Sequence, residues 1–129
     1  MKNLLIVSAL VESITGWALI VSPALPVSLL IGAAPDTALE LVLARIAGAA
    51  LLALGIACWG AHNDAGSGGA RGVVAAMLFY DAAALAVLVY ASLGLRLSGI
   101  GLWPAVLLHL ALAGWCVVAL GRSNRGKAV

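Results

Sequence analysis

The sequence predicts an all-α membrane protein, an up-and-down bundle of four transmembrane helices with both termini cytoplasmic. Of its 129 residues, 64% are hydrophobic and only 9% are charged, and the mean hydropathy is +1.16. Soluble domains are about half apolar and about a quarter charged, so the composition excludes that class. The formal net charge of +2 is too small to indicate nucleic-acid binding. The length allows a single domain, residues 1–129.

Four segments are long and apolar enough to cross a bilayer, which takes about 20 residues of helix. They are residues 3–22, 38–61, 72–93 and 102–120. Residues 62–71 are predicted to form a glycine-rich cytoplasmic linker, and residues 121–129 a basic cytoplasmic tail. The apolar stretch inside residues 23–37 is too short to span, and the sequence leaves open whether it lies in the interface or folds back into the membrane.

Local signals set these boundaries. Pro23 and Pro26 end the first span, because proline lacks the N–H that a continuing helix requires. Thr37 and Glu40 have the spacing of a capping box at the start of the second span. Pro104 fits the first turn of the fourth helix, where its missing donor costs nothing.

The distribution of positive charge orients the predicted bundle. Cytoplasmic loops carry an excess of Lys and Arg. Outside the spans, the other side of the bundle has only Arg96. The remaining cations all fall on the side of the termini, which is therefore expected to be cytoplasmic: Lys2, Arg71, Arg122, Arg125 and Lys127.

Each span carries one ionisable side chain near its middle: Glu12, Arg45, Asp81 and His109. At a helix rise of about 1.5 Å per residue, Glu12 and Asp81 lie about 13–15 Å from the cytoplasmic side, and Arg45 and His109 about 10 Å from the outer surface. The hydrocarbon core is about 30 Å thick, so all four share a middle band. Because a lone carboxylate is costly there, we expect Arg45 to bridge Glu12 and Asp81, with His109 donating to either acid or titrating beside them.

These four residues are the expected ligand-binding residues. They would form the polar floor of an apolar intramembrane pocket for a lipid-like or quinone-like molecule. Alternative interpretations are that the cluster is a proton-handling site, or that the network only fixes the register of the helices. Tyr80 points about 100° away from Asp81 around its helix, so it need not join the cluster.

Other chemistries find no support in the sequence. It contains no GxSxG, HExxH or phosphate-binding loop. Cys58 and Cys116 lack CxxC spacing and are expected to be reduced packing residues. His62 and His109 differ in depth, which argues against a bis-histidine haem. We expect no catalytic residue, metal ligand or cofactor, and a protein that is not an enzyme.

The stretch LARIAGAALLALGIACWGA, residues 43–61, follows a first span that ends in proline and a short apolar segment with glycine. This layout resembles the DoxX-like superfamily of small bacterial four-helix membrane proteins. The resemblance implies an inner-membrane bundle with polar residues inside, in a superfamily with some members linked to quinone-dependent sulfur oxidation or to oxidoreductase complexes. Distant relatives hold sterol-like ligands. Arg45 is the position carried over from the resemblance.

A second likeness leads to a different function. VESITG, early in the first of four short spans, is similar to the region of the essential glutamate in small multidrug-resistance transporters. That likeness implies a dimeric proton-coupled exporter that uses Glu12, although Arg45 departs from the transporter pattern. A third alternative is a structural subunit of an oxidoreductase complex. Membrane lipid is the expected partner. The sequence leaves open whether the chain also forms a homodimer or joins a larger membrane complex.

Overall fold

The computed structural model describes residues 1–125, and its side chains are described to Arg122. This part of the chain is helical and contains no strand. The helices are α1 (Lys2–Val21), α2 (Ala24–Ile31), α3 (Ala38–Ala61), the 3-10 turn η1 (His62–Asp64), α4 (Gly68–Leu93) and α5 (Leu102–Arg125).

The four long helices α1, α3, α4 and α5 are each long and apolar enough to cross a membrane, which confirms the predicted set of spans. Large apolar side chains cover their outward faces. Ile14 is 69% exposed and Phe79 77% exposed, the reverse of a soluble protein with a polar surface. Such a surface is suited to contact with acyl chains rather than with water.

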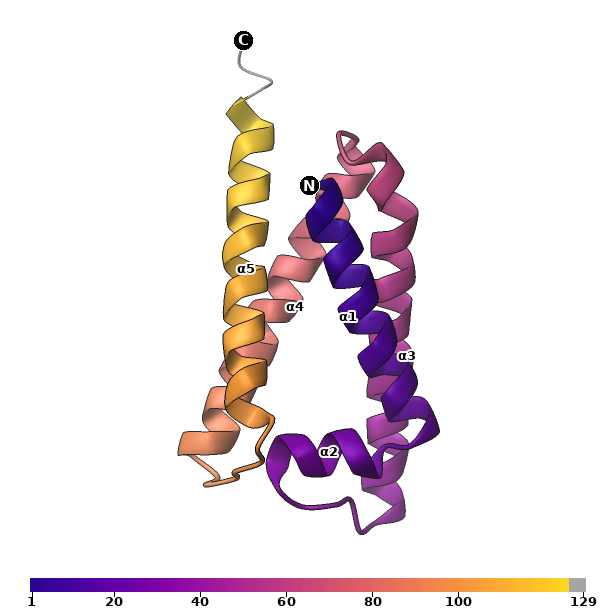
Figure 1. The fold of residues 1–129 in the computed structure, drawn as a ribbon, viewed down its shortest axis with the longest axis vertical. Coiled ribbons are helices and arrows are strands. Elements are labelled where there is room, and N and C mark those ends of the chain that lie inside the picture. Colours follow the sequence, from indigo (N-terminus) through magenta and orange to yellow (C-terminus); the bar gives the residue numbers. More distant parts are fainter. Residues whose placement is uncertain (126–129) are drawn as a thin grey trace.

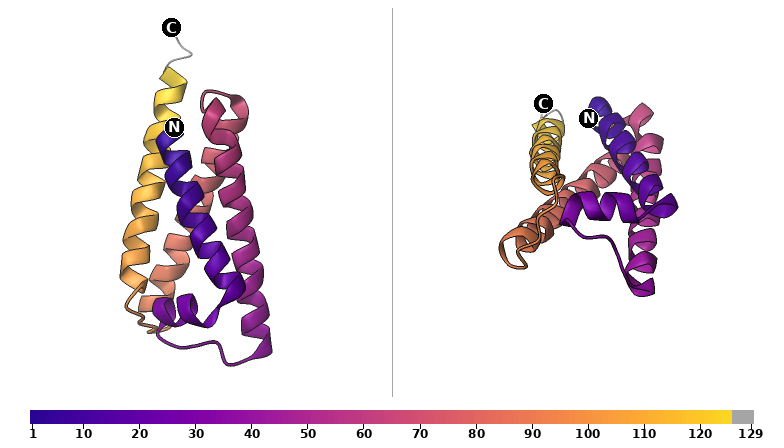
Figure 2. Two further views of the ribbon diagram at one scale, coloured as in Figure 1. Left: turned by 45° about the vertical axis from the view of Figure 1, so that its right-hand side comes forward. Right: turned by 60° about the horizontal axis from the view of Figure 1, so that its bottom comes forward.

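The long helices form two antiparallel pairs (Figure 1). α1 packs along α3, and α4 packs along α5, whereas fewer contacts join one pair to the other. The N-terminus, η1 and the end of α5 lie at one end of the bundle, where the pairs approach each other. The pairs diverge toward the opposite end, and α2 lies across that end between them (Figures 1 and 2).

Glycines set the close contact between α1 and α3. A Cβ on Gly16 would lie 2.6 Å from the backbone oxygen of Gly48, and a Cβ on Gly48 would lie 2.7 Å from that of Gly16. Two turns further along α3, a Cβ on Gly55 would collide with the Ser13 hydroxyl. Small residues at these positions let the two backbones approach, as is typical of helix contacts in membranes.

The segment whose structure the sequence left open forms α2 and a connector. The N–H of Gly101 donates to the backbone oxygen of Leu29 over 2.8 Å, which ties α2 to the start of α5. Gly32 ends α2 with φ +83°, a left-handed conformation that favours glycine. Leu25 and Leu29 remain exposed. This short helix therefore lies across the end of the bundle and does not span it.

The observed boundaries refine the predicted ones. The capping box is confirmed, with the Thr37 hydroxyl accepting from the Glu40 N–H and the Glu40 carboxylate accepting from the Thr37 N–H. The linker prediction was too long, because the Ser67 hydroxyl caps α4 and residues 68–71 are helical. The start of the predicted tail continues α5 to Arg125, while Lys127 lies outside the described residues.

Candidate functional site

A polar pair joins the middle of α4 to the first half of α5. The Nδ1 atom of His109 lies 2.8 Å from Oδ1 of Asp81. A carboxylate can only accept hydrogen bonds, so Nδ1 is the donor. Asp81 is fully buried and the His109 side chain is 12% exposed. The predicted contact between His109 and one of the acids is thus confirmed, and that acid is Asp81.

Glu12 adds a second carboxylate from α1. Its exposed fraction is 1%, and it lies within electrostatic range of both Asp81 and His109. Ser8, one turn earlier on the same face of α1, is also 1% exposed. We refer to Ser8, Glu12, Asp81 and His109 as the central cluster.

Apolar layers enclose the central cluster on both sides along the helix axes. Toward the termini, Met77 on α4 and Leu112 on α5 belong to a core shared by all four long helices. Toward α2, Leu85 and Val106 belong to a second apolar group that also includes Leu30. Charged groups held between such layers have little access to water, so their interactions with one another are strong.

Three buried polar atoms of the central cluster have no hydrogen-bond partner among the described residues. They are Ser8 Oγ, Glu12 Oε1 and Asp81 Oδ2. An unsatisfied buried polar group costs about 1–3 kcal/mol. Most such groups in folded proteins are paired, and those that are not call for an explanation. Because all three atoms belong to the central cluster, this cluster is the candidate functional site of the bundle.

Arg45 does not join the cluster, and the predicted bridge to Glu12 and Asp81 is wrong. Its side chain is exposed, and Nε donates to the backbone oxygen of Ile20 over 3.2 Å. The glycine contact fixes this register by placing Gly48 opposite Gly16. Arg45 consequently lies beside Ile20, eight residues or about 12 Å along α1 from Glu12. There it satisfies a carbonyl in the last turn of α1 that lacks an intrahelical partner.

Tyr80 approaches the cluster, although its position on α4 gave no reason to include it. Its ring centre lies 5.6 Å from that of His109, edge to face. Cys58 and Cys116 are fully buried free thiols in the apolar core beside the cluster. A pairing of Tyr80 with His109 depends on how α4 and α5 cross, which periodicity alone does not specify.

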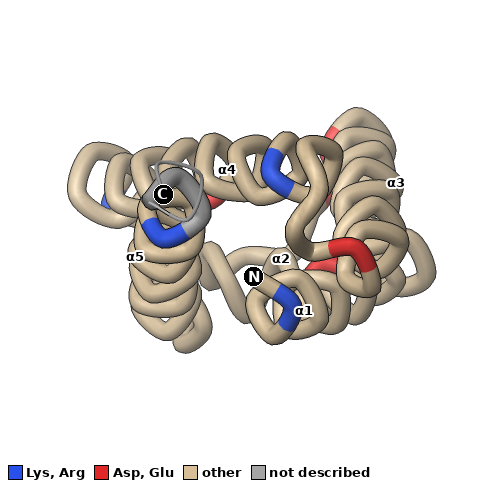
Figure 3. The backbone as a smooth tube through the Cα atoms, turned by 90° about the horizontal axis from the view of Figure 1, so that it is seen from above, with Lys and Arg blue, Asp and Glu red and all other residues tan. Residues whose placement is uncertain are grey.

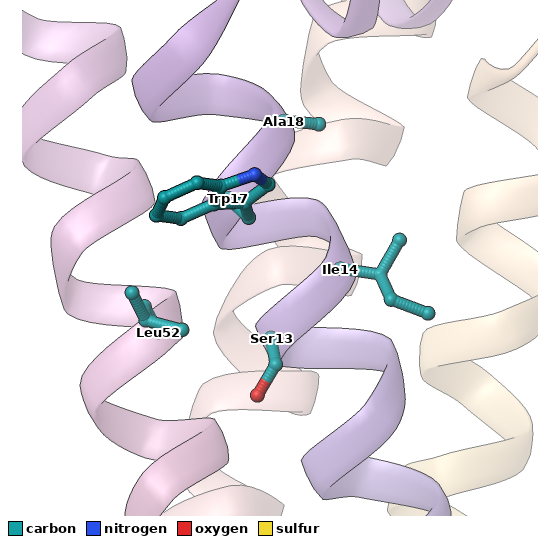
Figure 4. Close-up of a pocket in the computed structure, with 5 residues that line it drawn as sticks. All are labelled: Ser13, Ile14, Trp17, Ala18 and Leu52. Carbon is teal, nitrogen blue, oxygen red and sulfur yellow. The ribbon is translucent and has the colours of Figure 1, made fainter.

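Two apolar grooves lie along the outer side of the α1–α3 contact. The first has a volume of about 500 Å³, and Figure 4 shows Trp17, Ser13 and Leu52 around it. The second, of about 390 Å³, extends along the same two helices to Trp59. Neither groove is lined by a residue of the central cluster. Neither groove is the predicted pocket above a polar floor, because neither reaches Glu12, Asp81 or His109.

No family model, curated protein or solved structure matches this chain. Among residues 1–122, no group of three His, Cys, Asp or Glu side chains is arranged to hold a metal ion. Function therefore has to be inferred from the central cluster and its surroundings.

Proposed function

We propose that this chain is a small multi-pass membrane protein that binds a lipid-like or quinone-like molecule inside the membrane, with the head group held at the central cluster. The observation that carries the proposal is the set of unpartnered oxygens on Ser8, Glu12 and Asp81 beside the Asp81–His109 pair. Arg45 is dropped from the proposed binding residues, because it bonds to Ile20.

The surroundings of the cluster select the class of ligand. A head group that offers hydrogen-bond donors would satisfy the free oxygens of Glu12 and Asp81, which water or a protein group would otherwise have to satisfy. The apolar layers formed by Leu85, Val106 and Leu30 would contact a hydrocarbon tail. Binding sites of this type are mostly apolar with a few placed polar groups.

Mass spectrometry of molecules retained after gentle purification tests this function. Wild type is expected to retain an apolar molecule with a polar head, and Asp81→Asn to lose at least nine-tenths of it. Glu40→Gln is the matched control, because it neutralises an exposed carboxylate while glutamine still completes the capping box. Equal retention by wild type and Asp81→Asn would contradict the proposal.

A dimeric proton-coupled exporter is the second candidate, and one observation favours it. Arg45 bonds to Ile20 and leaves Glu12 without a cation from α3, so the main objection to the exporter is removed. However, Glu12 is covered by its own chain. The exporter hypothesis predicts that expression raises cellular tolerance to ethidium and that Glu12→Gln abolishes this effect. Unchanged tolerance with the wild-type protein would eliminate it.

The location in the cell and the family are part of the same proposal. Lys and Arg positions on α1, α4 and α5 lie at the end that holds the N-terminus and the end of α5 (Figure 3), which supports a cytoplasmic location of that end. We assign the protein to a bacterial inner membrane. A DoxX-like origin agrees with a four-helix bundle that has polar residues inside. Its carried-over residue, Arg45, serves here as a partner of the α1 backbone.

A further inference from the structure

The charges of the central cluster do not balance. It contains two carboxylic acids, Glu12 and Asp81, and one imidazole, His109. If all three were charged, the site would carry one net negative charge in apolar surroundings. Burial of an unbalanced charge is strongly unfavourable, and such groups pair, take up a proton or bind a cation.

The side chains that face the cluster supply no positive charge. The neighbouring side chains are Tyr80 of α4, Cys58 of α3 and Cys116 of α5. Ser8 of α1 belongs to the cluster itself and is uncharged. These groups are neutral when they carry their protons.

The described cations lie elsewhere. Arg45 is exposed and bonds to Ile20. Arg71 is ten residues from Asp81 along α4, about 15 Å. The remaining ones lie at helix ends or in the loop before α5: Lys2, Arg96 and Arg122.

We propose that the central cluster is a proton-binding site, in which Glu12 carries one exchangeable proton beside an ion pair of Asp81 and protonated His109. This state is neutral overall. Oε1 of Glu12 and Oδ2 of Asp81 are both buried without a hydrogen-bond partner, but the other oxygen of Asp81 has an imidazole nitrogen at 2.8 Å. Glu12 is therefore the carrier. Uptake adds one proton from water to the Glu12 carboxylate, and release returns it, so the step needs no other reactant.

The inference concerns the same cluster as the proposed function, but it requires no organic ligand. It also differs from the exporter hypothesis, because a single chain forms the site. The two proposals fail separately: ligand retention tests the first, and the protonation state of the delipidated protein tests the second.

The composition of the chain makes this protonation directly measurable. Glu12 and Glu40 are the only glutamates, and His62 and His109 are the only histidines. NMR of delipidated protein with ¹³C-labelled glutamate carboxyl groups gives two signals. Glu40→Gln removes the exposed one and assigns the other to Glu12 in a protein whose cluster is unchanged. The test therefore does not depend on whether a Glu12 variant folds.

At pH 7 and with no added sodium, the Glu12 carboxyl carbon is expected at the position of a protonated acid. It should move to the carboxylate position as the pH rises. The ¹⁵N signals of His109 are expected to be those of an imidazolium. A Glu12 signal at the carboxylate position at pH 7 would overturn the proposal. So would a signal that shifts with sodium concentration at constant pH, since a bound cation would then balance the charge.

Discussion

The imidazole of His109, on the first half of α5, and the carboxylate of Asp81, halfway along α4, meet at 2.8 Å inside the apolar interior. This contact gives the bundle a polar centre between its two apolar core groups. Because the Asp81 side chain is fully buried, water cannot replace His109 as its hydrogen-bond partner.

The costs of losing the two partners should not be additive. His109→Leu leaves Asp81 buried without its partner and is expected to cost about 3–5 kcal/mol of unfolding free energy. The double variant Asp81→Leu/His109→Leu should cost clearly less than the sum of the two single variants. Reversible unfolding in mixed micelles measures all three.

His62→Leu is the matched control for this cycle, because His62 lies in η1 outside the apolar core. It is expected to change stability by about 0.5 kcal/mol or less. Additive effects of the Asp81 and His109 substitutions would show that the two side chains do not interact.

The contact between α1 and α3 should not tolerate a methyl group. A Cβ on Gly16 would lie 2.6 Å from the Gly48 oxygen and 2.7 Å from the Leu52 nitrogen, both of them backbone atoms that cannot rotate away. Gly16→Ala is therefore expected to destabilise the protein by about 1–3 kcal/mol, as overpacking does.

Gly114 on α5 provides the comparison, since a Cβ there would meet no atom within 4 Å. Gly114→Ala should stabilise by about 0.5–1 kcal/mol, because alanine loses less backbone entropy in a helix than glycine does. Thermal unfolding of both variants measures the difference. Similar melting temperatures for the two would contradict the close approach of α1 and α3.

Arg45 should affect the end of α1 and leave the central cluster unchanged. Arg45→Met keeps most of the side-chain stem but removes the hydrogen bond to Ile20, at a cost of about 1 kcal/mol. The ¹⁵N spectrum of His109 is expected to be the same as in wild type. A change in the protonation of His109 in this variant would instead support the predicted bridge between Arg45 and the two acids.

Much of the fold follows from the sequence, because its physical causes are local. The length of each apolar run fixes the four spans, and the second one is observed at Ala38–Ala61, with the bounds that the sequence predicts. The capping box of Thr37 and Glu40 lies within four residues of chain. The start of α4 was missed, because the Ser67 cap preserves a helix through two glycines that the sequence pattern assigns to a linker.

The site was predictable only in part, for a geometric reason. Counting residues gives the depth of each group to within a few residues, and it correctly brings Asp81 and His109 together. It does not give the register between neighbouring helices, which the contact of Gly16 with Gly48 sets. That register separates Arg45 from Glu12, so the Glu12 carboxylate lacks the cationic partner that the sequence predicts for it.

The proposed orientation predicts a distinct labelling pattern in intact cells. Gly66→Cys lies at the end with the termini, where a Cβ meets no atom within 4 Å, and Ser98→Cys lies in the exposed loop before α5. A membrane-impermeant maleimide should label the Ser98→Cys variant in intact cells and the Gly66→Cys variant only after permeabilisation. The native thiols of Cys58 and Cys116 are fully buried and should not react. The opposite pattern would reverse the orientation.

The central claim is that Asp81 and His109 form a buried pair in the membrane interior. Solid-state NMR of protein in lipid bilayers, with ¹³C-labelled aspartate carboxyl groups and ¹⁵N-labelled histidine, measures it most directly. We predict a strong dipolar correlation between one imidazole nitrogen and one carboxyl carbon, which disappears in Asp81→Asn and persists in Asp64→Asn. The absence of that correlation in the wild-type protein would contradict the account.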